Sequence, residues 1–355
     1  MGGFVMKRYN NLYNFTYEDI EYVYQKVRRN TKNKRKIKKF EDYYSININM
    51  IKEVLDKKVY TPSHYNIFLI SEPKYRIVMS QNIFDKVINH LVSYKILLPI
   101  LDKSLIDCNI ATRMGKGTHY GIRRLKKYLN DMTGEIYALK FDIGKFFYNI
   151  DHDVLINLLK NKIKDKDALN ILIKIIRSTD FAYVNNKINY IKGKMNKKGF
   201  ILEINNLPIY IKGKGLPIGN MSSQILAIYY LNELDHFIKE KLHIKYYIRY
   251  MDDGVILSND KKYLRFCLFE IEKILKRYKL ELNKKTKIVN VSREGIDFLG
   301  FRFYIRKGVF LKVRSSCKKR FKKVISKDDL NIINSYKAHF KWGDCYNLVS
   351  KNIKV

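Results

Sequence analysis

Two spacings of apolar residues run along this chain, one typical of helices and the other of strands. Near the N-terminus the apolar positions share one helical face, at Ile20, Val23, Tyr24 and Val27. We therefore expect residues 1 to about 60 to be helical. Residues 65–79 form two short apolar runs separated by Ser-Glu-Pro at residues 71–73, and predict two strands joined by a turn. Another helix is expected from about residue 82 to 97.

Two strand-like runs carry acidic residues. Residues 246–258 are apolar and β-rich, but Asp252, Asp253 and Gly254 interrupt them, which predicts a hairpin with acids at its tip. A second apolar run leads into Asp142 and predicts a strand that delivers this carboxylate to the end of a sheet, beside the hairpin. Taken alone, Asp-Asp-Gly is more typical of an ordinary solvated turn.

Carboxylates that converge in this way need a positive partner, because they repel one another and are costly to bury. A divalent cation such as Mg²⁺ prefers oxygen ligands and leaves positions open for substrate phosphates. Three acids from two strands could hold two such ions about 3.5–4 Å apart, one activating a 3′-hydroxyl and one neutralising a leaving pyrophosphate. The pattern therefore favours phosphoryl transfer.

The remaining elements are expected to be mostly helical. Asp151 is interpreted as the N-cap of a helix that runs to about Ile163, and not as a catalytic acid. Within residues 164–212 we expect a helix to about Arg177 and then an exposed hairpin or loop. An apolar helix is expected from about Ile225 to Lys241.

Glycines and cations mark candidate binding segments. Gly115-Lys116-Gly117-Thr118 precedes a predicted helix and could present backbone N–H groups to phosphate, although it lacks the P-loop spacing. Residues 213–224 either allow close approach to a flat substrate such as a base pair, or form a loop and helix cap. Lys74 and Arg76 should project from one face of their hairpin, either to clamp a triphosphate or as an exposed strand face.

Charge sets the class of partner. The chain has 355 residues with 70 Lys and Arg against 34 Asp and Glu, a formal charge of +36, which favours a nucleic-acid partner. The basic run at residues 32–39 is either a solvated loop or a backbone contact. Four scattered cysteines, no secretory signal and no long apolar run predict a soluble cytoplasmic protein with reduced thiols and no membrane partner.

The order of these signals resembles a reverse transcriptase over roughly residues 60 to 305. The resemblance lies in Lys74 and Arg76, Asp142, residues 215–224, Tyr250-Met251-Asp252-Asp253 and Phe298-Leu299-Gly300-Phe301. It implies an α+β right-hand polymerase fold with fingers, a palm whose antiparallel sheet bears the Tyr-Met-Asp-Asp hairpin, and a helical thumb. The implied boundaries are an N-terminal helical basic extension at 1–60, fingers at 61–135, a palm at 136–304 with an insertion near 164–212, and a thumb at 305–355.

The resemblance also implies roles for individual residues. Asp142, Asp252 and Asp253 would be catalytic and would bind two Mg²⁺ ions, for which Mn²⁺ could substitute. Phe147 matches the bulky position that excludes a 2′-hydroxyl. The implied dNTP-binding residues are Lys74, Arg76, Ile143, Phe147, Ile218, Gly219, Gln224 and Lys285. The implied contacts to nucleic acid are Arg113, Lys116, Tyr250, Lys312, Arg314, Lys318, Lys319 and Arg320.

Within the superfamily of group II intron-like enzymes, the chain most resembles bacterial or phage reverse transcriptases of diversity-generating retroelements. Ile218 stands where many relatives have Gln, and a lost amide contact near the nascent base pair could loosen discrimination at template adenines. A reverse transcriptase of antiphage defence and a non-catalytic RNA-binding protein of the same fold are the alternatives. Implied partners are an RNA template, an RNA/DNA duplex, dNTPs, and a small basic accessory protein or a cognate non-coding RNA.

Overall fold

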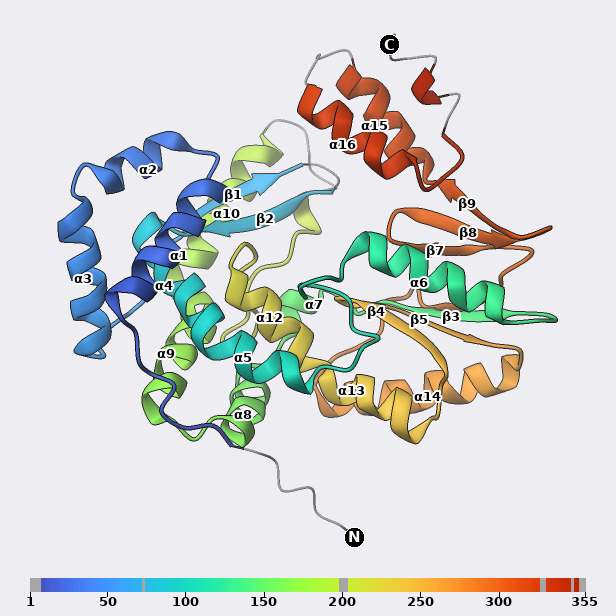
Figure 1. Cartoon of the computed structure of the whole chain (residues 1–355), viewed down its shortest axis with the longest axis horizontal. Coiled ribbons are helices and arrows are strands. Elements are labelled where there is room, and N and C mark those ends of the chain that lie inside the picture. The colour runs from blue at the N-terminus through green and yellow to red at the C-terminus, as the bar shows by residue number, and fades with distance from the viewer. Residues whose placement is uncertain (1–7, 72–73, 198–203, 326–329, 346–347, 351–355) are drawn as a thin grey trace. The chain divides into compact units, whose positions relative to one another are not determined.

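The computed structural model describes residues 8–71, 74–197, 204–325, 330–345 and 348–350 (Figure 1). The chain divides into two compact units. The helix-rich unit contains Met1–Leu105, Lys145–Glu233 and Arg277–Leu280, and the sheet unit contains Ile106–Gly144, Leu234–Lys276 and Glu281–Val355. Each unit is assembled from segments far apart in the sequence.

The helix-rich unit begins with the expected N-terminal helices. Its helices are α1 (Tyr17–Asn30), α2 (Lys34–Glu41), α3 (Tyr44–Asp56), α4 (Ile83–Val92), α5 (Leu98–Leu101), α7 (Phe146–Asn149), α8 (His152–Lys162), α9 (Lys166–Ile176), α10 (Ala182–Asn196) and α12 (Met221–Tyr230). The side chain of Thr16 accepts from Asp19 and starts α1 with a capping box. The predicted apolar face of α1 is buried, which confirms that prediction.

Two further predictions in this unit are confirmed. Strands β1 (Asn66–Ile70) and β2 (Arg76–Ser80) pair antiparallel, with Phe68 opposite Val78. Residues 72–73 of the predicted turn lie outside the described residues. The Asp151 carboxylate accepts the N–H of Val154 at 3.1 Å and caps α8, as its position before an apolar helix indicated.

The expected loop between residues 177 and 212 is wrong in its first part, because residues 182–196 form α10. The segment is rich in Asn and Lys, which hid a sparse helical stripe. Val184 and Ile188, four residues apart, are buried in a core with Ile67 and Ile77 of the β-hairpin. This packing stabilises a helix whose own sequence shows only weak amphipathicity.

The basic run at residues 32–39 belongs largely to a helix. Within α2, Ile37 and Phe40 are buried while the cations lie on the outer face. Asn33 caps the helix through a side-chain contact with the N–H of Lys36. The run is therefore not a loop, and its contact with nucleic acid remains a prediction.

The described part of the sheet unit contains two antiparallel sheets. The four-stranded sheet has the order β4 (Tyr246–Tyr250), β5 (Asp253–Ser258), β3 (Tyr137–Phe141), β6 (Lys287–Asn290). The three-stranded sheet has the order β7 (Ile296–Phe298), β8 (Phe301–Ile305), β9 (Val309–Val313). The helices are α6 (Thr118–Asp131), α14 (Lys261–Arg277), α15 (Ser315–Ile325) and α16 (Leu330–Phe340), with α13 (Asn232–His236) at the unit's edge.

The two faces of the four-stranded sheet have different partners. Ala138, Ile248 and Val255 project from one face into a core shared with α6 and the three-stranded sheet. Their neighbours along the strands face the opposite way, where α13 and α14 lie in Figure 1. Most residues of the two central strands, β5 and β3, are therefore buried.

Two sequence predictions need correction in the second half of the chain. The helix expected at 225–241 begins earlier, at Met221, and is interrupted after Tyr230 before α13 begins. Almost every residue of α12 is buried. Its apolar sequence therefore gave no sign that the helix ends at Tyr230. Residues 305–313 were expected to open a helical thumb, but residues 301–305 and 309–313 pair as β8 and β9. Leu311 and Val313 alternate into the core there, the two-residue period of a strand.

All four cysteines are free and buried. Among the described residues, no helix combines the length and the apolar character that a membrane span requires.

Candidate active site

The hairpin of β4 and β5 carries the adjacent acids at its tip, as predicted. Tyr250 pairs with Asp253, which leaves Met251 and Asp252 as a two-residue loop. Met251 has a φ of +55°, a left-handed conformation that such loops usually assign to glycine. A methionine held in this conformation indicates that surrounding contacts determine the shape of the turn.

Strand β3 brings the third acid to the same end of the sheet. Phe141 is the last residue of β3 and lies opposite Gly254 of β5. The next residue, Asp142, therefore stands at the level of Asp253 across the two strands. The ring of Phe141 lies directly over Gly254, where an added Cβ would come within 2.2 Å of it.

The backbone of Asp142 is fixed by the segment that precedes β6. Its N–H donates to the hydroxyl of Thr286 at 3.3 Å, and its carbonyl accepts from the N–H of Asn283 at 2.7 Å. Gly144 continues this pairing by donating to the carbonyl of Glu281 at 3.0 Å. Sequence reasoning missed Asn283 and Thr286, because no local pattern links them to a carboxylate about 140 residues earlier.

Lys140 is a cation that lies beside the acids. It lies two residues before Asp142, and its Nζ is 3.5 Å from Oδ2 of Asp253. The other oxygen, Oδ1 of Asp253, is buried and has no hydrogen-bond partner. A buried carboxylate oxygen without a donor is costly, and a cation bound at this edge would satisfy it.

The electrostatics of the tip disfavour ionised acids without a counterion. Burial raises the pKa of the Asp252 carboxyl to about 7, and the negative charge of Asp142 adds to this shift. Burial also raises the pKa of Asp253 to about 6, against the opposing effects of Lys140 and Arg314. Raised pKa values of neighbouring acids that are partly buried are typical of functional sites.

The donor set suits a cation that also takes ligands from its substrate. Among the described residues, no group of three or more His, Cys, Asp and Glu side chains has the arrangement of a protein-only metal site. Mg²⁺ commonly needs only one or two protein carboxylates, with waters and phosphates completing its shell. Asp142 and Asp252, together with the unpartnered oxygen of Asp253, fit this second kind of site.

The predicted nucleotide-binding residues are divided between the units. Ile143 and Lys285 belong to the sheet unit, whereas Lys74, Arg76, Phe147, Ile218, Gly219 and Gln224 belong to the helix-rich unit. Ile143 is buried and forms a bridge with Leu282, while Lys285 is exposed. Ile143 therefore has a packing role, and its contact with a nucleotide remains a prediction.

Within the helix-rich unit, several of these residues come together around β2. The carbonyl of Ile218 accepts from the N–H of Met79 at 2.8 Å. Gly219 has a φ of +127°, and a Cβ there would lie 2.8 Å from the Met79 carbonyl oxygen. Only glycine allows the loop to approach the strand this closely.

Phe147 and Arg76 adjoin the same assembly. The carbonyl of Phe147 accepts from Leu216 at 2.8 Å, and the charge of Arg76 acts on the neighbouring Tyr148 hydroxyl. Arg76 and Lys74 are exposed, on either side of the half-buried Tyr75. Gln224 is an exposed residue of α12.

Two predicted contacts to nucleic acid have structural partners inside the sheet unit. Arg113 donates to the carbonyls of Ile106 at 2.8 Å and Asn109 at 3.2 Å. Lys116 donates to the Asp107 carboxylate at 2.7 Å. These cations hold the loop before α6, so their contribution to binding nucleic acid remains a prediction.

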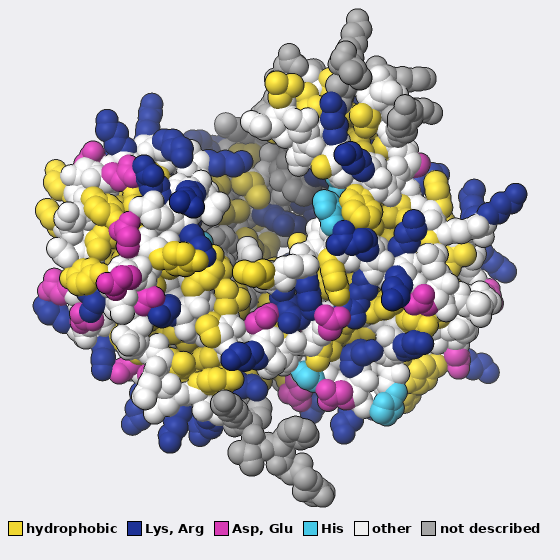
Figure 2. All heavy atoms as spheres, viewed as in Figure 1, with side chains coloured by type: hydrophobic (Ala, Val, Ile, Leu, Met, Phe, Trp, Pro, Cys, Tyr) yellow, Lys and Arg dark blue, Asp and Glu magenta, His cyan; other side chains and the backbone are white. Residues whose placement is uncertain are grey.

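The other candidate contacts lie at the end of β4, on β9 and in the segment that continues into α15. Tyr250 packs at the edge of its core, and Lys312 is exposed on β9. Arg314 lies 3.6 Å from Asp297, and Lys318 lies 3.3 Å from Asp344. Lys319 is exposed and Arg320 half-buried on α15. Figure 2 shows Lys and Arg over much of the face in view, in keeping with the charge of +36.

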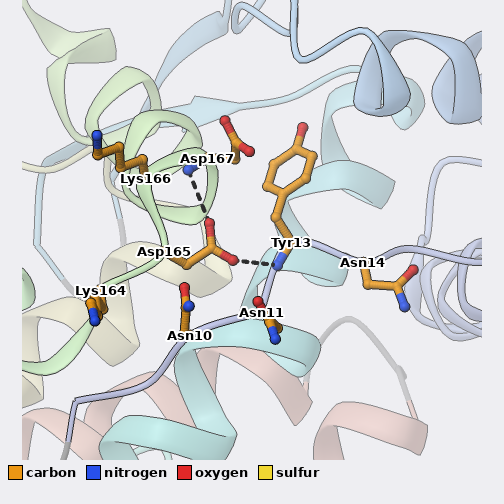
Figure 3. Close-up of a pocket in the computed structure, with 8 residues that line it drawn as sticks. All are labelled: Asn10, Asn11, Tyr13, Asn14, Lys164, Asp165, Lys166 and Asp167. Carbon is orange, nitrogen blue, oxygen red and sulfur yellow. Dashed lines mark hydrogen bonds between the residues drawn. The ribbon is translucent and has the colours of Figure 1, made fainter.

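A separate polar hollow in the helix-rich unit lacks the features of a reactive site. It is lined by Asn10, Asn11, Tyr13, Asn14 and residues 164–167 (Figure 3). Its central acid, Asp165, accepts from the N–H groups of Leu12 and Tyr13 and also caps α9. These bonds stabilise the carboxylate, and they lower its pKa against the effect of burial.

Comparison with known families identifies the class of protein. Residues 70–303 match the model of the reverse transcriptase (RNA-dependent DNA polymerase) family. The match covers more than half of the chain and includes the strands that carry the acids. The chain therefore belongs to the reverse transcriptase family, and its helices and antiparallel sheets form the α+β fold of that family, as predicted.

Individual relatives point to proteins encoded by group II introns. The chain is 28% identical over 203 aligned residues to a putative COX1/OXI3 intron 2 protein of Saccharomyces cerevisiae, covering 46% of this chain and 23% of that protein. It is 27% identical over 154 residues to the group II intron-encoded protein LtrA of Lactococcus lactis, covering 43% of this chain and 21% of that protein. The chain thus spans less than a quarter of the length of these relatives.

Among solved structures, telomerase from Candida albicans in complex with a fragment of telomeric RNA is similar, with a TM-score of 0.47 and 14% identity. The similarity covers 82% of this chain and 53% of that one.

Proposed function

We propose that this chain is an RNA-directed DNA polymerase that makes cDNA by Mg²⁺-dependent phosphoryl transfer. The observation that carries the proposal is the edge of the four-stranded sheet, where Asp142, Asp252 and Asp253 meet and one buried oxygen of Asp253 has no partner. Three half-buried acids facing RNA would only repel its phosphates, so their presence favours catalysis over a purely RNA-binding role.

The carboxylates would hold the metal ions, with Asp142 and Asp252 as the principal ligands. When bound, such ions lower the pKa of an attacking hydroxyl and neutralise the leaving pyrophosphate. Lys140 compensates part of the charge of Asp253. Thr286 and Asn283 fix the backbone from which Asp142 projects.

The other predicted site residues would contact the nucleotide. We assign Lys74 and Arg76 to the triphosphate, Phe147 to exclusion of the 2′-hydroxyl, and Ile218 and Gly219 to the nascent base pair. The backbone hydrogen bond between Met79 and Ile218 supports this assignment, because it holds the loop that contains Ile218 against β2, the strand that begins at Arg76. Gln224, Ile143 and Lys285 would complete the surroundings.

The biological setting that we favour is a diversity-generating retroelement, in which the template is RNA and errors concentrate at adenines. Ile218 supports it, because an aliphatic side chain cannot make the amide contact of Gln. Antiphage defence with a dedicated non-coding RNA is the second candidate, supported by the same Ile-Gly-Asn-Met-Ser-Ser-Gln segment. A small basic protein or a non-coding RNA would be the partner in the respective settings.

The test is primer extension by the purified protein on a defined RNA template with dNTPs and Mg²⁺, followed by sequencing of every product. We expect Asp252→Asn to abolish incorporation while RNA affinity stays within a few-fold, because Asn keeps the shape but loses the charge that holds the metal. Incorporation retained in this variant would contradict the metal assignment. If the protein binds RNA but makes no product with both candidate partners supplied, the result would favour a non-catalytic RNA-binding protein of the same fold.

A further inference from the structure

A fully buried ion pair lies behind the hairpin tip, on the face of the sheet opposite Lys140. Arg249 is the residue before Tyr250 on β4, and its side chain and that of Asp235 are both 0% exposed. Nε of Arg249 donates to Oδ1 of Asp235 at 2.7 Å, and a second guanidinium nitrogen donates to Oδ2. The pair is therefore bidentate, the geometry in which Arg binds a carboxylate most strongly.

The third arm of the same guanidinium reaches the turn. Nη1 of Arg249 donates to the carbonyl oxygen of Met251, the residue held at a φ of +55°. That carbonyl belongs to the peptide bond between Met251 and Asp252. The hydrogen bond thus fixes the orientation of the peptide plane that leads directly into Asp252.

Asp235 is itself immobilised by more than Arg249. The hydroxyl of Tyr247 donates to Oδ1 of Asp235 at 2.7 Å, so three donors from β4 converge on one carboxylate. The backbone of Arg249 is also held on its outer side, where its N–H donates to Cys108 and its carbonyl accepts from Ile110, both at 3.0 Å. These bonds restrict the movement of both the Asp235 carboxylate and the Arg249 backbone, from which the hydrogen bond to the turn is made.

We infer that Asp235 and Arg249 act as positioning residues that hold the left-handed turn at Met251 and thereby aim the Asp252 carboxylate at its metal. The inference deepens the proposed function, on which its catalytic part rests. Asp235 neutralises the guanidinium, so Arg249 can orient the turn without acting as the counterion of the acids. Lys could replace the charge of Arg249 but not its planar fork, which bonds the acid and the turn together.

If Arg249 and Asp235 only stabilised the fold, the hydrogen bond from Arg249 to the Met251 carbonyl would not be needed. Buried ion pairs can often be replaced by apolar side chains with little loss of stability, because their desolvation cost offsets their attraction. A triple variant, Asp235→Leu with Tyr247→Phe and Arg249→Met, therefore offers a folded protein without the connection. Tyr247→Phe alone is the matched control, since it removes one bond to Asp235 and leaves Arg249 joined to the turn.

The experiment measures amide hydrogen exchange of the peptide covering residues 246–258 in wild type, Arg249→Lys, the triple variant and Tyr247→Phe, without substrate. We expect faster exchange at the turn in Arg249→Lys and the triple variant, at unchanged protection of α8, and wild-type exchange at the turn in Tyr247→Phe. Unchanged exchange at the turn in a folded triple variant would overturn the inference. This readout does not depend on polymerase activity.

Primer extension with the same proteins tests the catalytic part. Displacement of a catalytic group by about 1 Å can cost roughly a hundredfold, so we expect kcat to fall at least tenfold in Arg249→Lys and the triple variant, with unchanged RNA affinity. A faster-exchanging turn with wild-type kcat would refute the positioning role. If the wild-type protein makes no DNA but the variants show the expected faster exchange, the proposed polymerase function is wrong. The conclusion that Arg249 and Asp235 hold the turn at Met251 is then retained.

Discussion

The ring of Phe141 fills the space that a side chain at Gly254 would need. The two residues lie opposite each other on β3 and β5, and a Cβ at position 254 would be 2.2, 2.5 and 2.7 Å from three ring carbons. Each residue adjoins an acid of the candidate site, since Phe141 precedes Asp142 and Gly254 follows Asp253. The contact therefore links the packing of the sheet to the spacing of the carboxylates.

Gly254→Ala should disturb both stability and activity. Overpacking of this kind typically costs about 1–3 kcal/mol, because the Phe141 ring would have to move. We expect a lower midpoint of chemical unfolding and weaker primer extension. Gly308→Ala, at a glycine with no atom within 4 Å of an added Cβ, should leave both nearly unchanged. Equal effects of the two substitutions would contradict this view of the Phe141 contact.

His90 should make stability depend on pH. Burial, with help from the charges of Lys86 and Lys26, lowers the pKa of His90 from 6.5 to about 4 in the folded protein. The unfolded chain binds a proton at this residue first, so folding should weaken as pH falls from about 6.5 toward 4. We expect His90→Gln to flatten this dependence in unfolding titrations, and His243→Asn, at an exposed site, to leave it intact. If the pH dependence of the free energy of unfolding is unchanged in His90→Gln, that dependence arises from other titratable groups.

Phe147→Ala should admit ribonucleotides. The half-buried Phe147 follows Asp142 by five residues, and its removal would leave space for a 2′-hydroxyl. The measurement is the ratio of kcat/KM for dNTPs to that for rNTPs. Phe146→Leu, at the buried neighbouring position, controls for altered packing. A sugar preference unchanged in Phe147→Ala would remove this residue from the gate.

Ile218→Gln should lower misincorporation opposite template adenine. The hydrogen bond between this residue and Met79 joins backbone atoms, so the substitution can introduce an amide and keep this bond to β2, although the Ile218 side chain also packs against the core around Met79. Product sequencing gives the error rate for each template base. Ile211→Gln, at a residue 58% exposed, is the matched control. The same adenine error rate in Ile218→Gln and wild type would separate fidelity from this residue.

Asp151 should matter for stability and not for chemistry. It caps α8 and binds Lys279 at 2.7 Å. Loss of a cap costs about 1 kcal/mol, so we expect Asp151→Ala to lower the free energy of unfolding while kcat stays at the wild-type value. Asp151→Asn, which can still cap, should cost less. A large loss of kcat in a folded Asp151→Asn protein would show that this acid takes part in the reaction.

The sequence by itself determined the elements that depend on near neighbours. The four-residue spacing in α1, the alternation in β1 and β2, and Asp151 before α8 were each readable from a few adjacent positions. The same holds for the acids of the hairpin, because Asp252 and Asp253 interrupt an otherwise apolar run. Such features follow from local backbone geometry, in which side chains repeat with a period of 3.6 or 2 residues.

Only the tertiary structure decided how these elements meet. The strand order β4-β5-β3-β6 places Asp142 at the level of Asp253, although more than a hundred residues separate them. The bond from Thr286 to Asp142 and the pair of Asp235 and Arg249 likewise depend on packing. The helix α10 forms because its sparse apolar stripe finds a partner in the β-hairpin. These contacts arise where buried surfaces fit, and that fit leaves no repeating signal in the sequence.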